Sequence, residues 1–131
     1  MKKYLSILVA VLFIATTSSC TKQYVTPNTN QTVFANVKAN SWVLSPDGKS
    51  YENTILVPAL DDQYNDDGAV LVYMSFFDGV YEQLPEVYDG VSYSFYHSRG
   101  KIVIYSQTPG AAPVKPTDDV VVKIVLIDSN Y

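Results

Sequence analysis

The chain carries few side chains for covalent or metal chemistry, with a single cysteine, Cys20, and a single histidine, His97, in 131 residues. One cysteine excludes an intrachain disulfide and a metal site built from several thiolates. His97 falls in a predicted turn beside Arg99, where a solvated residue is the simpler interpretation and a general base the alternative. A triad of Ser98, His97 and Asp89 can be written down, but no nucleophile elbow frames it. We therefore expect no enzymatic activity, no cofactor and no metal centre.

Positive charge is scarce as well, because 13 Asp and Glu residues outnumber 9 Lys and Arg residues. Removal of the two lysines of an N-terminal signal leaves a net charge of −6. Such a chain repels phosphate backbones and has no basic stripe, which argues against nucleic acid as a partner and against electrostatic docking to a membrane. The carboxylate pairs Glu82 with Glu86 and Asp118 with Asp119 fall in predicted loops or beside turns, where solvation accounts for them.

The N-terminal apolar run, Leu5 to Ala15, falls well short of the roughly 20 residues that a permanent transmembrane helix needs. Lys2 and Lys3 precede this run, and small polar residues follow it up to Cys20. A positively charged start, an apolar stretch and a boundary of small residues are typical of an export signal. We therefore expect residues 1–19 to be a signal peptide that is removed.

The boundary resembles the lipobox of bacterial lipoproteins, in which small residues precede a cysteine that is lipidated and becomes the mature N-terminus. Ser18, Ser19 and Cys20 fit this pattern, whereas Thr17 stands where the family usually has leucine or another aliphatic residue. The resemblance implies acyl chains such as palmitate on Cys20, and two or three chains suffice for stable anchoring. The alternative is an ordinary signal peptide that leaves Cys20 as a free thiol, a liability in an oxidising compartment.

The segment from Cys20 to Thr32 is polar, is interrupted by proline and lacks both helical and alternating apolar periodicity. We interpret residues 20–32 as a lipidated cysteine followed by a flexible tether, whose r.m.s. reach is about 20 Å. Residues 33–131 are long enough for one domain with a single core.

This domain is predicted to be all β, because no run keeps helical periodicity for three turns and short apolar runs alternate with turn residues. We expect three hairpins and a final strand: 33–44 with 51–58, 69–77 with 80–85, 91–96 with 101–107, and 120–128. Val70, Val72, Met74 and Phe76 are predicted to share one face of a central strand. About seven antiparallel strands without a disulfide predict a β-sandwich, with an immunoglobulin-like arrangement as the leading interpretation.

An acidic loop from Asp61 to Gly68 raises the question of calcium, which prefers six or more oxygen ligands. With Gly68 at the glycine position of an EF-hand loop, Gln63 takes the first ligand position and Met74 the position of the bidentate glutamate. The register therefore fails. A solvated acidic turn is the simpler interpretation, and calcium binding stays open.

Several of these features together resemble a group of small lipoproteins common in Bacteroidota. They are the lipidated start, Trp42 with the following Asp47-Gly48 turn, the strand at 68–74, the Leu84-Pro85 pair and the final strand. The resemblance covers nearly the whole mature chain, but its motifs are structural. It implies a β-domain of unknown role in the periplasm or at the cell surface, anchored by lipid in the outer membrane.

The aromatic content is the feature that bears on binding, with ten tyrosines and one tryptophan after residue 20. Aromatic side chains stack on sugars and anchor protein interfaces, but they are also good strand formers. Tyr93 or Tyr96, with Tyr105 on the paired strand, are the expected contact residues for a protein or glycan partner. We expect a membrane-tethered binding or structural module, with a glycan-binding accessory lipoprotein or a cell-envelope hydrolase as alternatives.

Overall fold

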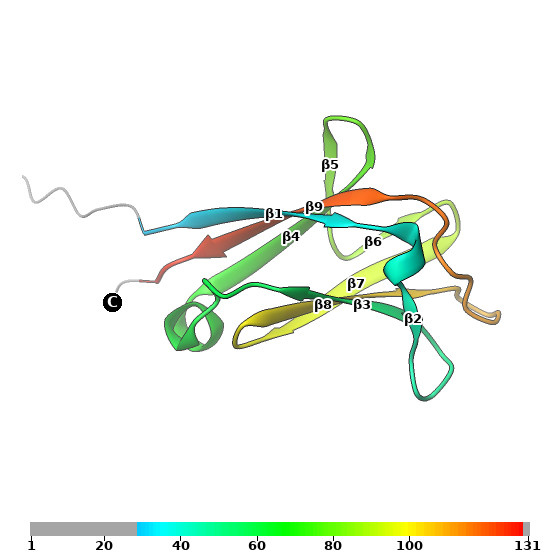
Figure 1. Ribbon diagram of the computed structural model, residues 1–131, viewed down its shortest axis with the longest axis horizontal. Coiled ribbons are helices and arrows are strands. Elements are labelled where there is room, and N and C mark those ends of the chain that lie inside the picture. Colours follow the sequence, from blue (N-terminus) through cyan, green and yellow to red (C-terminus); the bar gives the residue numbers. More distant parts are fainter. Residues whose placement is uncertain (1–28, 130–131) are drawn as a thin grey trace, which may run out of the picture.

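The computed structural model describes residues 29–129. The expected signal peptide, Cys20 and most of the expected tether lie outside the described residues. Two antiparallel sheets stack on each other (Figure 1), which confirms the predicted all-β sandwich. One sheet has the strand order β1-β9-β4-β5, and the other has the order β2-β3-β8-β7-β6. Within the described range no helix is long and apolar enough to cross a membrane.

Nine strands make up these sheets, two more than expected, because two of them are very short. Their bounds are β1 Gln31–Val37, β2 Val43–Leu44, β3 Tyr51–Leu56, β4 Ala69–Phe77, β5 Val80–Gln83, β6 Glu86–Tyr88, β7 Val91–Ser98, β8 Lys101–Gln107 and β9 Val120–Ile127. A 3-10 turn, η1 (Ala39–Ser41), and a π-helical turn, η2 (Gln63–Asp67), complete the elements. The chain crosses between the sheets four times, as Greek-key sandwiches do.

The core lies between the sheets and follows the alternation of the strands. In β9 the side chains of Val120, Val122, Ile124 and Leu126 are buried, whereas those between them are half-exposed. The predicted inner face of β4 is confirmed. Val70, Val72 and Met74 are buried, and Phe76 packs against the core. On the other face Leu71 and Tyr73 are half-buried and Phe77 is exposed, so this strand is central in its sheet without being fully covered on both sides.

The first expected hairpin is wrong in most of its length. Residues 33–44 divide between the sheets: β1 pairs with β9, and only Val43 and Leu44 pair with β3. Before Trp42 the expected strand is interrupted by the η1 turn, which carries the chain from one sheet to the other. Strand β1 also begins at Gln31, inside the expected tether, because backbone pairing with Leu126 does not depend on an apolar side chain.

The other two hairpins are confirmed. Strands β4 and β5 pair across Asp78-Gly79, where Gly79 adopts a positive φ of 74° that suits glycine. Strands β7 and β8 pair in continuous register, and residues 108–119 form the expected loop before β9. The β7–β8 turn is shorter than expected, because His97 belongs to β7 and pairs with Ile102.

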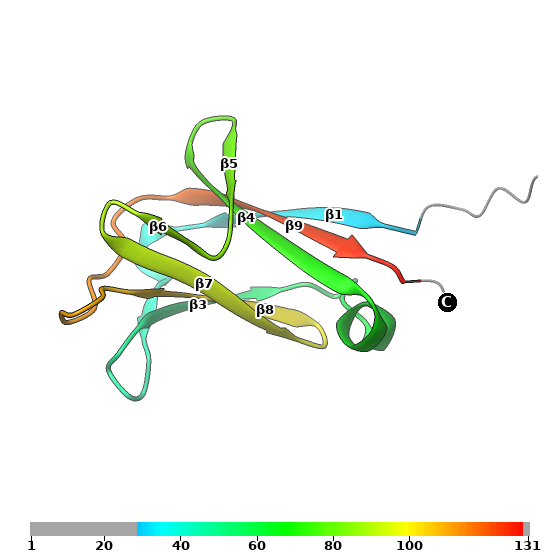
Figure 2. The same ribbon diagram turned by 180° about the vertical axis from the view of Figure 1, so that it is seen from behind.

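One end of the sandwich is closed by the η2 turn, which contains the buried Tyr64. The Tyr64 hydroxyl accepts a hydrogen bond from Gln31 Nε2 at 3.1 Å and donates one to the Thr29 carbonyl oxygen. Gly68, where the turn meets β4, is packed so tightly that a Cβ atom there would overlap the Ile127 carbonyl oxygen. This end also holds the start of β1 and the end of β9 (Figures 1 and 2).

Candidate functional site

The opposite end of the sandwich contains a partly open pocket of about 410 Å³. It lies between the ends of the sheets, where β4 ends and β9 begins. Its lining includes residues of the loop that precedes β9 and of the turn between β6 and β7. The ribbon places both segments at this end of the sandwich (Figure 1). The lining residues are Trp42, Met74, Phe76, Tyr88, Asp89, Gly90, Val91, Tyr93, Thr108, Val114, Lys115, Pro116, Thr117, Asp118 and Val120.

Four aromatic side chains form a connected group along this pocket. Phe76 and Tyr88 stack with ring centroids 4.1 Å apart and an interplanar angle of 12°. Tyr93 lies 5.1 Å from Phe76 and 6.3 Å from Trp42, in tilted and edge-on arrangements. Pairs of this kind stabilise by about 0.5–1.5 kcal/mol beyond area burial. The aromatic wall is therefore held in place before any ligand arrives.

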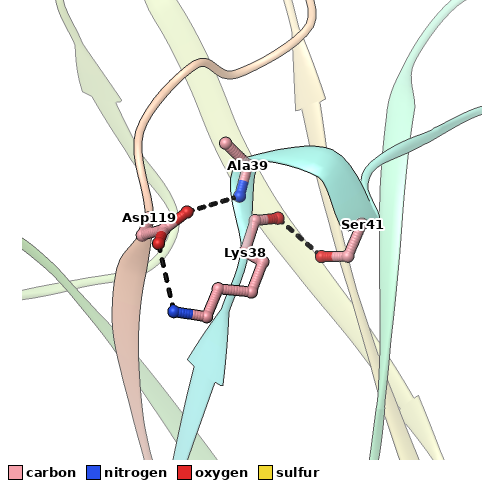
Figure 3. Close-up of polar contacts among 4 residues, drawn as sticks. All are labelled: Lys38, Ala39, Ser41 and Asp119. Atoms are coloured by element: carbon pink, nitrogen blue, oxygen red, sulfur yellow. Dashed lines mark hydrogen bonds and ion pairs between the residues drawn. The ribbon is translucent and has the colours of Figure 1, made fainter.

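A small polar network surrounds the η1 turn, which directly precedes Trp42 in the chain (Figure 3). One carboxylate oxygen of Asp119 accepts the Ala39 backbone N–H at 2.8 Å, and the other accepts Lys38 Nζ at 3.2 Å. The Ser41 hydroxyl donates to the Lys38 carbonyl oxygen at 2.6 Å. Because Asp119 precedes β9 and η1 follows β1, this network ties together the pocket-side ends of these two paired strands. The Ala39 and Lys38 hydrogen bonds hold the pKa of Asp119 below its usual value.

The polar side chains of the pocket are concentrated at its mouth. Asp89, Lys115, Thr117 and Asp118 are exposed, in contrast to the buried Trp42. Asp89 adopts a positive φ of 48° at the turn before β7, a conformation that aspartate tolerates. The pocket therefore has an apolar, aromatic floor and a charged mouth, the usual arrangement of a small-ligand site.

Tyr93 is the deepest tyrosine of this pocket, with 7 % of its surface exposed. Burial raises the pKa of its hydroxyl, and the negative charges of Asp118 and Asp89 raise it further. Tyr93 is therefore a neutral phenol at physiological pH. Trp42 carries a second notable polar atom, because its Nε1 is buried without a hydrogen-bond partner among residues 29–129.

The three tyrosines expected as contact residues do not form one patch. Tyr93 faces the interior and lines the pocket, as its buried state shows. Tyr96 and Tyr105 lie on the outer face of the five-stranded sheet, with ring centroids 6.2 Å apart. The strand alternation gives the reason, since Tyr93 and Tyr96 are an odd number of residues apart and point to opposite faces. Tyr96 and Tyr105 are diagonal neighbours across the β7–β8 pair, since Tyr96 pairs with Val103 and Tyr105 with Ser94, and their contact with a partner stays a prediction.

His97 lies in β7 and is half-buried, so its expected position in an exposed turn is wrong. Its Nδ1 shares a hydrogen bond of 2.9 Å with Asn65 Oδ1 of η2. Asp89 lies beyond the other end of β7, at the pocket. The strand therefore separates His97 from Asp89, and the triad with Ser98 is not assembled.

The carboxylates of Glu82 and Glu86 are not simply solvated, which corrects the expectation from the sequence. Glu82 belongs to β5 and Glu86 to β6, on either side of the crossing at the cis bond between Leu84 and Pro85. Both side chains are half-buried, and Glu86 Oε1 has no hydrogen-bond partner among the described residues. Burial first, and then the hydrogen bond with Glu82 and its charge, raise the pKa of Glu86 to about 7.

Three of the four aspartates of the 61–68 loop engage partners of their own chain. Asp61 Oδ1 accepts the Tyr64 backbone N–H at 3.1 Å, and Asp62 forms an exposed ion pair with Arg99 at 3.1 Å. Asp66 accepts a hydrogen bond from the side-chain amide of Asn65 at 2.6 Å. Within residues 29–129 no group of three or more His, Cys, Asp or Glu residues is placed to hold a metal ion.

A second aromatic group lies on the outer face of the four-stranded sheet. The Lys123 ammonium lies 4.5 Å from the Tyr73 ring centroid and 4.4 Å from that of Tyr81. Phe34 packs against Tyr81 with centroids 6.2 Å apart. The faces of these tyrosine rings are thus already occupied by a lysine of the chain, which favours the pocket over this group as a ligand site.

Comparison with known proteins gives no relative: no family model, curated protein or solved structure matches the chain. The pocket itself was missed by sequence reasoning. Its walls come from the 88–91 turn and the 114–118 loop, which are separate in sequence. Their proline, glycine and aspartate residues predict loops, but no local pattern predicts that these loops meet around Trp42 and Tyr93.

Proposed function

We propose that this protein is a lipid-anchored binding module of the bacterial cell envelope, and that its aromatic pocket binds a glycan. The main support for this proposal is the pocket itself, which combines a preformed wall of four aromatic rings with a polar mouth. Sugar rings present flat C–H faces and a polar edge, and such a surface matches both parts. The volume of about 410 Å³ lies within the range of small-ligand sites.

The position of the pocket supports presentation from a tether. Gln31 pairs with Leu126 at the closed end of the sandwich, and Val37 pairs with Val120 at the pocket end. Strand β1 therefore begins at the end of the sandwich opposite the pocket. With acyl chains on Cys20 in the outer membrane, the domain would present its pocket away from the lipid, on the periplasmic or the surface side.

A hydrolase is the second candidate, since Asp89 and Asp118 both line the pocket and glycosidases use two carboxyl groups. Both side chains are exposed, however, whereas the general acid of such enzymes depends on burial to keep its proton. We therefore propose binding without turnover. Incubation of the protein with each bound glycan and measurement of new reducing ends tests this: an increase that an Asp118→Asn variant abolishes would establish the hydrolase instead.

The binding proposal is tested with the soluble chain that starts at Thr21, which contains all the described strands, on an array of envelope and host glycans. Tyr88→Ala removes a ring from the pocket wall, and Thr117→Arg places a bulky side chain at its exposed mouth without disturbing the core. Tyr96→Ala is the matched control, because it removes an exposed tyrosine from the outer face. We expect binding to fall at least tenfold in both pocket variants and to persist in the control. Binding that survives Thr117→Arg would refute the pocket as the site.

The anchor is tested separately in cells that process lipoproteins. We expect mass spectrometry of the purified protein to find acyl chains on Cys20 and an N-terminus at that residue. A Cys20→Ala variant should move from the membrane fraction to the soluble fraction. An unmodified Cys20 in a protein released into the medium would refute the anchor.

A further inference from the structure

The mouth of the pocket carries more negative than positive charge. Asp89 and Asp118 line it together with one lysine, Lys115, which gives a net formal charge of −1. The two carboxylates act inside the pocket, since both raise the pKa of the Tyr93 hydroxyl. The described lining therefore disfavours a carboxylate or phosphate ligand and favours a cation.

The aromatic wall favours the same sign of charge. The faces of Trp, Tyr and Phe rings carry negative partial charge, so ammonium groups bind over them. This molecule already shows the interaction on its outer face, where the Lys123 ammonium lies between the rings of Tyr73 and Tyr81. In the pocket, by contrast, the rings of Tyr88 and Tyr93 stand beside two carboxylates. Rings and carboxylates together form a site for an organic ammonium group.

We infer that the pocket selects a ligand with a protonated amine, and that within the proposed glycan-binding function this ligand is an amino sugar. The ammonium group would lie between the aromatic wall and the carboxylates of Asp89 and Asp118. The sugar ring would stack on the half-buried Tyr88, and its hydroxyl groups would reach Thr117 at the mouth. Removal of the charge by N-acetylation should therefore weaken binding, although acetylation leaves the sugar ring unchanged.

Three probes test the inference by NMR titration of the isotope-labelled soluble chain at about pH 6, where alkylammonium groups keep their proton. They are a glucosamine tetramer, the fully N-acetylated tetramer and the peptide Gly-Lys-Gly. Asp118→Asn removes one negative charge at the pocket. Asp66→Asn makes the same change in η2 at the closed end, and Lys115→Ala removes the positive charge at the mouth.

We expect the glucosamine tetramer to bind at least tenfold more tightly than its acetylated form, with shifts at the Trp42 indole and the 88–91 turn. Asp118→Asn should weaken this binding about fivefold, as expected for a partly solvated charge pair. Asp66→Asn should leave it unchanged, and Lys115→Ala should strengthen it. Tighter binding of the acetylated tetramer, or loss of binding in Lys115→Ala, would overturn the inference.

The outcomes also separate this inference from the proposed function. Preferred binding of the acetylated tetramer keeps the glycan-binding function and refutes selection for an amine. Binding of the peptide alone keeps the selection for an amine and refutes the glycan as its source. Absence of shifts at the pocket with all three probes refutes both.

Discussion

Glu86 makes the stability of the fold depend on pH in a direction opposite to that of most carboxylates. Its pKa is raised from 4.5 to about 7 in the folded protein, because the side chain is partly buried and faces Glu82. The folded state therefore binds the proton more tightly than the unfolded state does. Stability from this group is fully present below about pH 4.5 and is lost as the pH rises through 7.

The magnitude follows from the shift in pKa. At 1.36 kcal/mol for each unit, a shift from 4.5 to about 7 sets an upper bound of about 3.4 kcal/mol. Glu86 keeps part of its contact with water, and screening reduces the expected effect to about 1–2 kcal/mol. Glu86→Gln keeps the shape and the hydrogen-bonding capacity of the side chain without the charge. It should stabilise the protein by this amount at pH 8 and change little at pH 5.

Urea unfolding of the parent protein and the variant between pH 5 and pH 8.5 measures this difference. A gain of about 1–2 kcal/mol corresponds to a rise in Tm of roughly 5–15 °C for a domain of this size. Glu52→Gln on the outer face of β3 is the matched control, because it makes the same chemical change away from Glu82. If the parent and Glu86→Gln show parallel pH profiles, the assignment of the proton to this carboxyl pair is wrong.

Three further changes test the fold. Gly68→Ala should destabilise the fold by about 3 kcal/mol or more in urea unfolding, because the new Cβ atom meets backbone atoms. Gly79→Ala should cost about 1 kcal/mol, because only its positive φ opposes a side chain. Equal costs for the two variants would contradict the tight packing at Gly68. Ser106→Ala should stabilise the fold by about 1 kcal/mol, because the buried Ser106 hydroxyl has no hydrogen-bond partner among the described residues. Ser45→Ala should destabilise the fold, because the Ser45 hydroxyl makes hydrogen bonds with Asp47 and Ser50. Stability changes of the same sign in both variants would contradict this difference. Asp119→Ala should lower the Tm at pH 7 but not at pH 2. The pKa of Asp119 is lowered in the folded protein, so the stability that its carboxylate contributes is lost as the pH falls below 3.8. An equal loss of Tm at both pH values would show that the charge of Asp119 is not responsible.

Sequence periodicity predicted the strands and their faces, because the alternation of side chains is local. The inner face of β4 and the β7–β8 hairpin follow directly from it. The partner of β1 could not be predicted in this way, because its alternation suits β3 and β9 equally well. The outcome depends on the η1 turn, where Asp119, next to β9 in the same sheet as β1, accepts the Ala39 backbone N–H.

The site was less predictable than the fold for a related physical reason. The propensity of tyrosine for strands indicated that Tyr93 lies in β7, but its role depends on the Phe76, Tyr88 and Trp42 rings that surround it. Glu86 shows the same limit. Its raised pKa arises from the Glu82 carboxylate on the other sheet and from burial at the crossing, neither of which a local pattern contains.

The pairing of β1 with β9 has a mechanical consequence. All seven residues of β1 are paired with β9, and the strand runs from the closed end to the pocket end. A force that pulls the N-terminal end of β1 away from a ligand held in the pocket acts along the strand. The ladder is then loaded in shear, so its hydrogen bonds resist together and do not open one after another like a zipper.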